Sequence, residues 1–298
     1  YVMFNSASHT LAAGTAVSNR HSSSAPEHIT FTGGPHADPA GDFKNELSSG
    51  PSQPGLSKAN VYETGSQKTN NLELDLVKGV TVEFWLKKDN WCGINAAKET
   101  IFTNIASGSS TDRLDIFLDP NASSGSLYVT VHSGSTSDIF SFDSGVSNLA
   151  DGNWRHFAIS LKTDATTTAK FYLNGVSQHQ SSSSNAYSAV LGKMVGSLGA
   201  YGTDYGSILK GYGNISFASF DEFRYWKTER NAQEIGRNWR EQIHGGTNTD
   251  NIKYDNISNP VDLGIYFKFN EGITGLASVD STVLDYSGRI SNGVFVNY

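Results

Sequence analysis

Apolar and polar residues alternate along much of the chain from about residue 58 onward. In residues 80–86, valine, phenylalanine and leucine hold the even positions, whereas Glu83 and Trp85 hold odd ones. Successive side chains of a β-strand point to opposite faces, so this alternation predicts strands that bury one face. The same alternation recurs at residues 114–118, 127–131, 157–161, 171–173, 215–226 and 263–269. The pattern therefore predicts an all-β protein.

Turn signals separate these predicted strands. Asn174-Gly175 is the strongest of them, because both residues tolerate the positive φ that a two-residue hairpin turn requires. Further turns are expected at Asp119-Pro120-Asn121, Ser123-Ser124-Gly125 and Asp151-Gly152-Asn153. Many short strands joined by such turns are typical of a β-sandwich.

One helix is expected late in the chain, at residues 231–243. Asn231 can cap its N-terminus, and Glu234, three residues further on, would complete a capping box. An apolar stripe that faces a sheet is predicted from the residues at every fourth position, Ile235, Trp239 and Ile243. A pair of glycines follows and would end the helix.

The two ends of the chain differ from this central part. Residues 1–57 are broken by proline, glycine and serine, so we expect an irregular extension there. Within it, residues 1–4 and 28–31 are candidates for short edge strands. Residues 58–245 should form the sandwich, followed by a tail strand and loop at residues 246–298.

The composition of the chain limits the classes of function that it can have. The 298 residues include 17% charged side chains and carry a formal net charge of −7. An acidic surface without clustered lysine or arginine gives no basis for binding nucleic acid, which requires neutralised phosphates. No stretch approaches the roughly 18 apolar residues of a membrane span, so no membrane insertion is expected. Cys92 is the only cysteine, which excludes disulfides within the chain.

Four short motifs follow one another in the central part. They are Val82-Glu83-Phe84-Trp85-Leu86, then Asp151-Gly152-Asn153-Trp154-Arg155-His156-Phe157, then Phe171-Tyr172-Leu173-Asn174-Gly175, and finally Phe220-Asp221-Glu222-Phe223-Arg224-Tyr225-Trp226. In this order they resemble the motifs of laminin-G-like domains, except that Arg155 stands where the family has a first histidine. The resemblance implies an antiparallel jelly-roll β-sandwich of the concanavalin A-like kind.

The tail extends this resemblance. Residues 266–272, followed by Asp285-Tyr286-Ser287-Gly288, look like the opening segment of another such module. The chain therefore looks like part of a longer modular protein. Arrays of this kind resemble large structural proteins of tailed bacteriophages, especially marine ones.

The same sandwich also hosts glucanases, so catalysis has to be judged from the residues themselves. Laminarinase-type hydrolases carry two glutamates at the ends of a Glu-apolar-Asp-apolar-apolar-Glu strand, one as nucleophile and one as acid. Residues 73–78 follow this pattern as far as Val77 but end in Lys78. Without the second carboxylate there is no general acid. We therefore expect no enzymatic activity.

Several motif residues are expected to serve the fold. Asp221 should accept backbone N–H bonds at a loop end, and Glu222 should pair with Arg224 or Arg230. Core positions are expected for four tryptophans, Trp85, Trp154, Trp226 and Trp239. Trp91 lies in a loop and is the one tryptophan expected at the surface.

Binding is the alternative to catalysis, and sugar-binding surfaces combine aromatic faces with carboxylates and side-chain amides. The glycine-bearing segment 201–214 offers the best such combination. The candidate ligand-binding residues are Tyr201, Asp204, Tyr205, Tyr212, Asn214 and the loop residue Trp91. A hairpin loop with partly buried tyrosines would have the same sequence, so this interpretation stays open.

Calcium is common in laminin-G-like domains, and the resemblance implies it as a candidate cofactor here. Calcium prefers oxygen ligands. Loop oxygens that could hold it belong to Asp112, Asp119, Asn121 and Asp204. No contiguous loop of the EF-hand type specifies such a site.

Two functional hypotheses follow, both non-catalytic. The first is a structural or attachment module of a virion, in a capsid, tail or fibre. Its partners would be other virion proteins, copies of itself and cell-surface glycans. The second is a carbohydrate-binding, lectin-like module of a secreted or surface bacterial protein. A virion module should assemble through its N-terminal extension, whereas a lectin module should act as a monomer.

Overall fold

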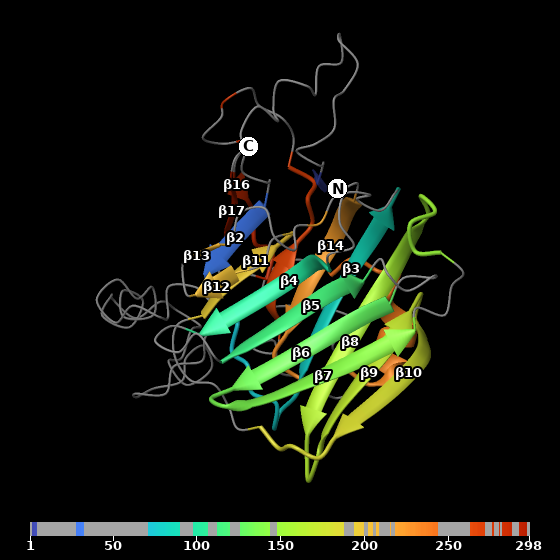
Figure 1. Ribbon diagram of the computed structural model, residues 1–298. Helices are drawn as coiled ribbons and strands as arrows, with labels where there is room; N and C mark the ends of the chain where they lie inside the picture. The colour runs from blue at the N-terminus through green and yellow to red at the C-terminus, as the bar shows by residue number, and fades with distance from the viewer. Residues whose placement is uncertain are drawn as a thin grey trace, which may run out of the picture.

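The computed structural model describes most of the central part of the chain together with short segments near both ends. Two antiparallel sheets pack face to face, and one short helix lies outside them (Figure 1). This confirms the antiparallel β-sandwich predicted from the sequence. The described residues are 2–4, 28–32, 71–89, 98–106, 112–119, 126–143, 148–187, 194–199, 202–204, 207–208, 215, 218–243, 263–271, 276, 280, 282–287 and 292–296.

One sheet has seven strands in the order β1-β14-β3-β8-β9-β10, and β15 also pairs with β14. Every described pairing in it is antiparallel. Its strands are β1 (Val2–Phe4), β3 (Val80–Lys88), β8 (Trp154–Thr163), β9 (Thr167–Leu173), β10 (Val176–Ser183), β14 (Ala218–Trp226) and β15 (Leu263–Phe267).

The second sheet has eight strands in the order β16-β17-β2-β11-β4-β5-β6-β7, also antiparallel. A small hairpin of β12 (Gly202–Asp204) and β13 (Ser207–Ile208) lies against β4. The strands of this sheet are β2 (His28–Thr32), β4 (Glu99–Ala106), β5 (Arg113–Asp119), β6 (Ser126–Ser133), β7 (Thr136–Asp143), β11 (Met194–Leu198), β16 (Thr282–Val283) and β17 (Gly293–Val296).

The core lies between the two sheets and is built from the alternating apolar positions. In β3 the predicted inward residues, Phe84 among them, are fully buried. Phe84 stacks on Phe157 of the neighbouring strand with the ring centroids 5.4 Å apart. Across the sandwich, Phe102 of β4 meets Phe223 of β14 at 5.3 Å. Aromatic pairs therefore bind the strands within a sheet and the two sheets to each other.

Strand β14 contains an irregularity that keeps its apolar residues on the core side. Phe220 and Phe223 are three positions apart, so strict alternation would place them on opposite faces. The pairing with β3 shifts between Asp221 and Arg224, and Glu222 has a φ of 52°. Such a β-bulge adds a residue to one strand, and both phenylalanines are fully buried. A positive φ is strained in a residue other than glycine, so neighbouring contacts must hold Glu222 in place.

The hairpin predicted at Asn174-Gly175 is confirmed. The two residues have φ values of 50° and 78° and join β9 to β10. A Cβ on Gly175 would lie 2.3 Å from Cδ1 of Trp239. Glycine is therefore required at position 175 for two reasons: the turn needs a positive φ, and Trp239 leaves no room for a Cβ.

The helix α3 (Ala232–Asn238) begins as predicted. The side chain of Asn231 accepts from the N–H of Glu234 at 3.0 Å, and the carboxylate of Glu234 accepts from the N–H of Asn231 at 2.6 Å. These are the two halves of a capping box. Ile235 is fully buried in a cluster with Ala158 of β8.

No helix in the described part of the chain is long and apolar enough to span a membrane.

The end of the helix differs from the prediction. The helix stops at Asn238, not near residue 243. Arg224 donates to the carbonyl oxygen of Glu241 at 2.5 Å, and the N–H of Ile243 donates to the hydroxyl of Tyr266 at 3.3 Å. A helix reaching residue 243 would have paired the N–H of Ile243 with the carbonyl of Trp239, and here Tyr266 takes that place.

Segments near both ends of the chain belong to the same two sheets. β1 pairs with the first part of β14, and β15 pairs with its second part. β2 lies between β11 and β17, so it is an inner strand and not the edge strand expected. The tail, which looks like the opening segment of a further module, therefore helps to complete this sandwich.

Replacement Gly264→Ala in β15 should destabilise the whole sandwich. A Cβ there would lie 1.9 Å from the carbonyl oxygen of Asn71, a backbone atom that cannot easily move aside. Overpacking of this kind costs roughly 1–3 kcal/mol. Urea unfolding followed by tryptophan fluorescence should show a single transition at lower urea.

Gly134→Ala is the control, because its Cβ would meet nothing within 4 Å. It should cost about 1 kcal/mol through its positive φ alone. A Gly264→Ala protein as stable as the Gly134→Ala protein would contradict the close packing of β15.

Candidate functional site

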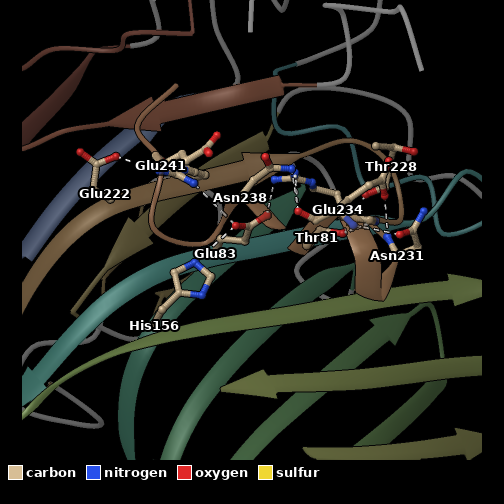
Figure 2. A network of polar contacts seen from close by, with 11 residues as sticks. Thr81, Glu83, His156, Glu222, Thr228, Asn231, Glu234, Asn238 and Glu241 are labelled. Carbon is tan, nitrogen blue, oxygen red and sulfur yellow. Dashed lines mark hydrogen bonds and ion pairs between the residues drawn. The ribbon is translucent and has the colours of Figure 1, made fainter. Parts of the chain in front are cut away.

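The motif residues that carry the family resemblance converge on one buried network (Figure 2). Glu83 is central to it. Arg230 Nη1 lies 2.7 Å from Glu83 Oε1, while His156 Nε2 and Arg224 Nη1 lie 3.4 Å and 3.8 Å from Glu83 Oε2. All four side chains are buried. They come from β3, β8, β14 and the chain between β14 and α3, so the network joins segments that are far apart in sequence.

Strand register brings these side chains together. The core takes Phe84 of β3, so its neighbour Glu83 points to the outer side of the seven-stranded sheet. Arg224 lies opposite Glu83 in β14, and His156 lies opposite Trp85 in β8. The alternation that makes β3 a strand thus also places one carboxylate where two other motifs can reach it.

A second carboxylate, Glu222, extends the network toward the tail. Arg224 Nη2 donates to it at 3.0 Å, Gln242 Nε2 donates at 2.8 Å, and the hydroxyl of Tyr266 donates to it as well. The predicted pairing of Glu222 with Arg224 is confirmed. Asp221 accepts the N–H of Glu222 at 3.1 Å, as expected for a residue that holds the local backbone. These contacts support the strained φ of Glu222.

Further hydrogen bonds attach the start of the helix to the sheet. The N–H of Arg230 donates to Thr81 Oγ1 at 2.8 Å, and the hydroxyl of Thr81 donates to the carbonyl of Thr228 at 2.9 Å. The guanidinium of Arg230 also lies over the ring of Trp226, 4.2 Å from its centroid. Helix and sheet are therefore held by polar as well as apolar contacts.

The charges in this network are fixed near neutral pH. Burial alone would raise the pKa of Glu83, but Arg230, His156 and Arg224 together lower it to about 2. Burial lowers the pKa of His156, against the effect of Glu83. Glu83 is thus an anion and His156 is neutral, and both are out of reach of solvent. The motif residues of this network act as a clamp for the fold.

The segment that looked like a glucanase strand has a different structure. Residues 71–78 form turns around a single bridge residue, Leu74. Asp75 causes this, since its side chain accepts from the N–H groups of Val77 and Lys78 at 3.0 Å and 3.3 Å. The ammonium of Lys78 lies 3.4 Å from Asp75 and 3.9 Å from Glu73. Residues 72–76 therefore do not form a regular strand, because a side-chain-capped turn competes with strand pairing.

The outer face of the eight-stranded sheet carries a different set of polar groups. Ser197, Thr103, Asp115 and Thr130 are aligned across β11, β4, β5 and β6 by the strand register. We call these four residues the polar row. They face away from the core, because their neighbours in β5 and β6 face into it, yet each is buried.

Within the polar row the charge of Asp115 is balanced. Arg113 Nε and Nη2 donate to its two carboxylate oxygens at 2.7 Å each, and the Thr130 hydroxyl donates at 3.3 Å. Burial nevertheless raises the pKa of Asp115, although Arg113 opposes the rise. The buried hydroxyl of Ser197 has no hydrogen-bond partner among the described residues. A buried hydroxyl without a partner is costly, and ordered water commonly pairs with such a group.

Toward β7 the same face becomes open and aromatic. Phe117 of β5 and Tyr128 of β6 lie side by side and are half-buried, and Lys98 Nζ lies 4.5 Å from the Tyr128 ring centroid. On β7, Ile139 is 64% exposed and Ser141 is exposed. This face therefore combines buried polar groups, aromatic rings and an accessible side.

Most of the ligand residues predicted from the sequence lie outside the described residues. These are Trp91, Tyr201, Tyr205, Tyr212 and Asn214. Asp204 is the last residue of β12, and the hairpin that contains it lies against β4. The segment singled out from the sequence thus comes next to the strand that carries Thr103 of the polar row. Sequence patterns could not have revealed the polar row, because its residues are single polar positions in four separate strands.

The predicted calcium ligands do not form one site. Asn121 lies outside the described residues. Asp112 precedes β5 and Asp119 ends it, so the two are about 23 Å apart at roughly 3.3 Å per residue. Asp112 also accepts the N–H of Gly134 at 2.8 Å, which explains its place at this turn. Among the described residues no group of three histidine, cysteine, aspartate or glutamate side chains could hold a metal ion.

The tryptophan predictions were correct in part. Trp226 is buried, whereas Trp85 and Trp239 are half-buried and pack against each other at 5.4 Å. Trp154 is 36% exposed, so its predicted core position was wrong. It is the first residue of β8, directly after a turn, where the sheet is no longer covered.

Comparison with known families agrees with this architecture. Residues 62–236, more than half of the chain, match the family described as the concanavalin A-like lectin/glucanases superfamily. No curated protein matches the chain in sequence.

Several solved structures match the chain at low similarity. A heptameric SAP-like pentraxin from Limulus polyphemus is 12% identical with a TM-score of 0.43, over 72% of this chain and 82% of the pentraxin. The receptor-binding domain of a botulinum neurotoxin C/D mosaic serotype is 13% identical with a TM-score of 0.40, over 57% of this chain and 38% of that one. The binding domain of Paraclostridial Mosquitocidal Protein 1 is 12% identical with a TM-score of 0.42, over 60% and 41%. Scores this low carry no weight for the function of this chain.

Replacement Glu83→Gln should strongly destabilise the protein at neutral pH. It removes the partner of buried Arg230 and Arg224, and breaking a buried ion pair costs about 3–5 kcal/mol. Urea unfolding of both proteins at pH 7 measures the difference. Asp164→Asn removes an exposed carboxylate 3.5 Å from Lys162 and should change stability by less than about 1 kcal/mol. An equal effect of both replacements would contradict the clamp.

The stability difference between wild type and Glu83→Gln should also depend on pH. The pKa of Glu83 falls from 4.5 to about 2 on folding. A lowered pKa stabilises the fold above pH 4.5, and this stabilisation is lost as the pH falls from there toward 2. The loss amounts to about 3 kcal/mol. Urea unfolding at successive pH values should show the two proteins converging only below pH 4.5, and a difference that does not shrink there would contradict the assignment.

Proposed function

The chain belongs to the concanavalin A-like lectin/glucanases superfamily, and from that premise we propose that it is a non-catalytic carbohydrate-binding module. Its binding surface is the outer face of the eight-stranded sheet, from Phe117 and Tyr128 to β7. The observation that carries the proposal is this half-buried aromatic pair, which lies beside the exposed Ile139 and Ser141 of β7.

The chemistry of this face suits a neutral glycan. Sugar hydroxyls need both donors and acceptors, and Ser141 and Asp119 on this face supply a hydroxyl and a carboxylate that solvent reaches. The apolar faces of sugar rings pack on aromatic side chains, which Phe117 and Tyr128 provide next to the row. Because Arg113 already neutralises Asp115, the face offers no uncompensated charge for a polyanion.

The spacing of carboxylates supports binding over hydrolysis. A glycosidase needs two carboxyl groups about 5–5.5 Å apart for retention or about 6.5–9.5 Å apart for inversion. Asp119, which shares this face of β5 with Asp115, is four residues away, or about 13 Å. The buried Glu83 and Glu222 serve the clamp on the opposite side of the sandwich.

The setting of the module is a further part of the proposal. Proteins with laminin-G-like motifs in this order resemble structural proteins of tailed bacteriophages, so we propose that this protein is part of a virion, where it attaches the particle to cell-surface glycans. A secreted or surface bacterial protein with the same lectin-like module is the alternative. Proteomics of purified phage particles distinguishes them: the protein should be found in the particles, and its presence only in bacterial culture fluid would favour the alternative.

Glycan-array screening should identify a neutral oligosaccharide ligand, with and without calcium in the buffer. Tyr128→Ala should then weaken its binding by roughly 3–10-fold, the value of an aromatic contact. Isothermal titration calorimetry measures the loss.

Trp154→Ala is the matched control, since Trp154 is an exposed aromatic residue on the other sheet. Its replacement should leave binding unchanged. If Trp154→Ala abolished binding while Tyr128→Ala did not, the proposed face would be wrong. If chelation of calcium abolished binding in every variant, the metal would have to belong to the site.

A further inference from the structure

The seven-stranded sheet ends in an accessible edge strand. β10 is the last strand in the sheet order and pairs only with β9 among the described residues. Its first five residues are all exposed, and the next three are exposed or half-buried. In Figure 1 it lies at the margin of the sandwich, beside the edge strand β7 of the other sheet.

This edge lacks the usual protection against pairing. A free edge presents backbone N–H and C=O groups to other strands, and proteins commonly block it with charged residues, proline or short length. β10 has eight residues, VSQHQSSS, with neither charge nor proline. A register shift between Ser177 and His179 disturbs its start, but residues 179–183 continue as a regular strand.

Other described edges differ from β10 in these respects. The edge strand β7 carries Asp138 and Asp143. At the opposite ends of the sheets, β1 has three residues and β16 has two, while β15, which also borders β14, has five residues that are all buried. The missing protection is therefore a property of β10 and not of the edges in general.

We propose that β10 is an interface for a second copy of this chain, which pairs with it antiparallel through residues 179–183. A two-fold axis at Ser181 would place Gln180 of one copy opposite Ser182 of the other. In a two-fold interface the same surface meets itself, so any charge on it would face a like charge. The chain carries a net charge of −7, so two copies repel each other over much of their surface. β10 has no charged side chain, and two copies can pair there without like charges facing each other.

The pairing would join the two seven-stranded sheets into one continuous sheet. It leaves the polar row free, because that row lies on the other sheet. The dimer would therefore present two copies of the proposed glycan surface, although self-association does not depend on glycan binding. Avidity for a surface with many glycans would increase without any new contact.

Disulfide trapping tests this geometry. Ser181→Cys in a Cys92→Ser background places one cysteine at the two-fold axis, so mild oxidation should yield a covalent dimer that reductant reverses. Ser141→Cys on β7 is the matched control, an exposed serine on the edge strand of the other sheet, and it should cross-link far more slowly. Equal cross-linking of the two variants would overturn the proposal.

Sedimentation equilibrium of the unmodified chain gives a second test. We expect reversible dimers at up to about 200 µM protein, since a small interface associates weakly. Gln180→Lys combined with Ser182→Lys places lysines opposite each other and should weaken association by roughly tenfold. The control pair, Ser137→Lys with Ser141→Lys on β7, should not.

Circular dichroism establishes that both lysine variants fold. A wild-type protein that stays monomeric over the whole concentration range, or dimers that both lysine pairs weaken equally, would refute the interface. These outcomes are separate from the glycan result, which is measured on the other sheet.

Discussion

The ion pair between Glu83 and Arg230 joins the centre of the seven-stranded sheet to the chain that leads into α3. A carboxylate that is fully buried must have cationic and hydrogen-bonding partners, because an isolated buried charge is very costly. Arg224 and His156 complete its surroundings from two further strands. This requirement explains why residues of three of the four motifs, in β3, β8 and β14, have to occur together with Arg230.

The clamp also divides the molecule into two sides. On the seven-stranded sheet, the buried network, α3 and the residues up to Ile243 cover the outer face, and Tyr266 of the tail strand connects to it through Glu222. The eight-stranded sheet carries no described helix on its outer face. On that face solvent reaches the half-buried Phe117 and Tyr128 and the exposed Ile139 and Ser141 of β7, whereas the polar row is buried.

The bulge in β14 shows how closely these requirements are linked. Phe220 and Phe223 must both enter the core, and Arg224 must point outward to Glu83. An extra residue with positive φ satisfies both conditions, and the side chain of that residue, Glu222, is held by Arg224, Gln242 and Tyr266. Local strain in one residue is thus offset by the hydrogen bonds that its own side chain makes.

Local patterns in the sequence correctly predicted those structural features that depend only on residues close together in the chain. Alternation at residues 80–86 placed a strand, Asn174-Gly175 placed a hairpin, and Asn231 with Glu234 placed a helix start, since each of these rests on short-range geometry and capping. They could not reveal where α3 ends, because beyond Asn238 the carbonyl of Glu241 accepts from Arg224 and the N–H of Ile243 donates to Tyr266.

Only the tertiary structure decided the candidate sites. The polar row consists of single residues from four strands, which the strand register aligns. Trp154 is exposed because its strand begins beyond the covered part of the sheet. Asp112 and Asp119 are separated by the length of β5. The sequence by itself determined the sandwich and the pairing of Glu222 with Arg224. The pairing of strands that are far apart in sequence determined which polar residues share a surface. This depends on the register between strands and not on the order of residues along the chain.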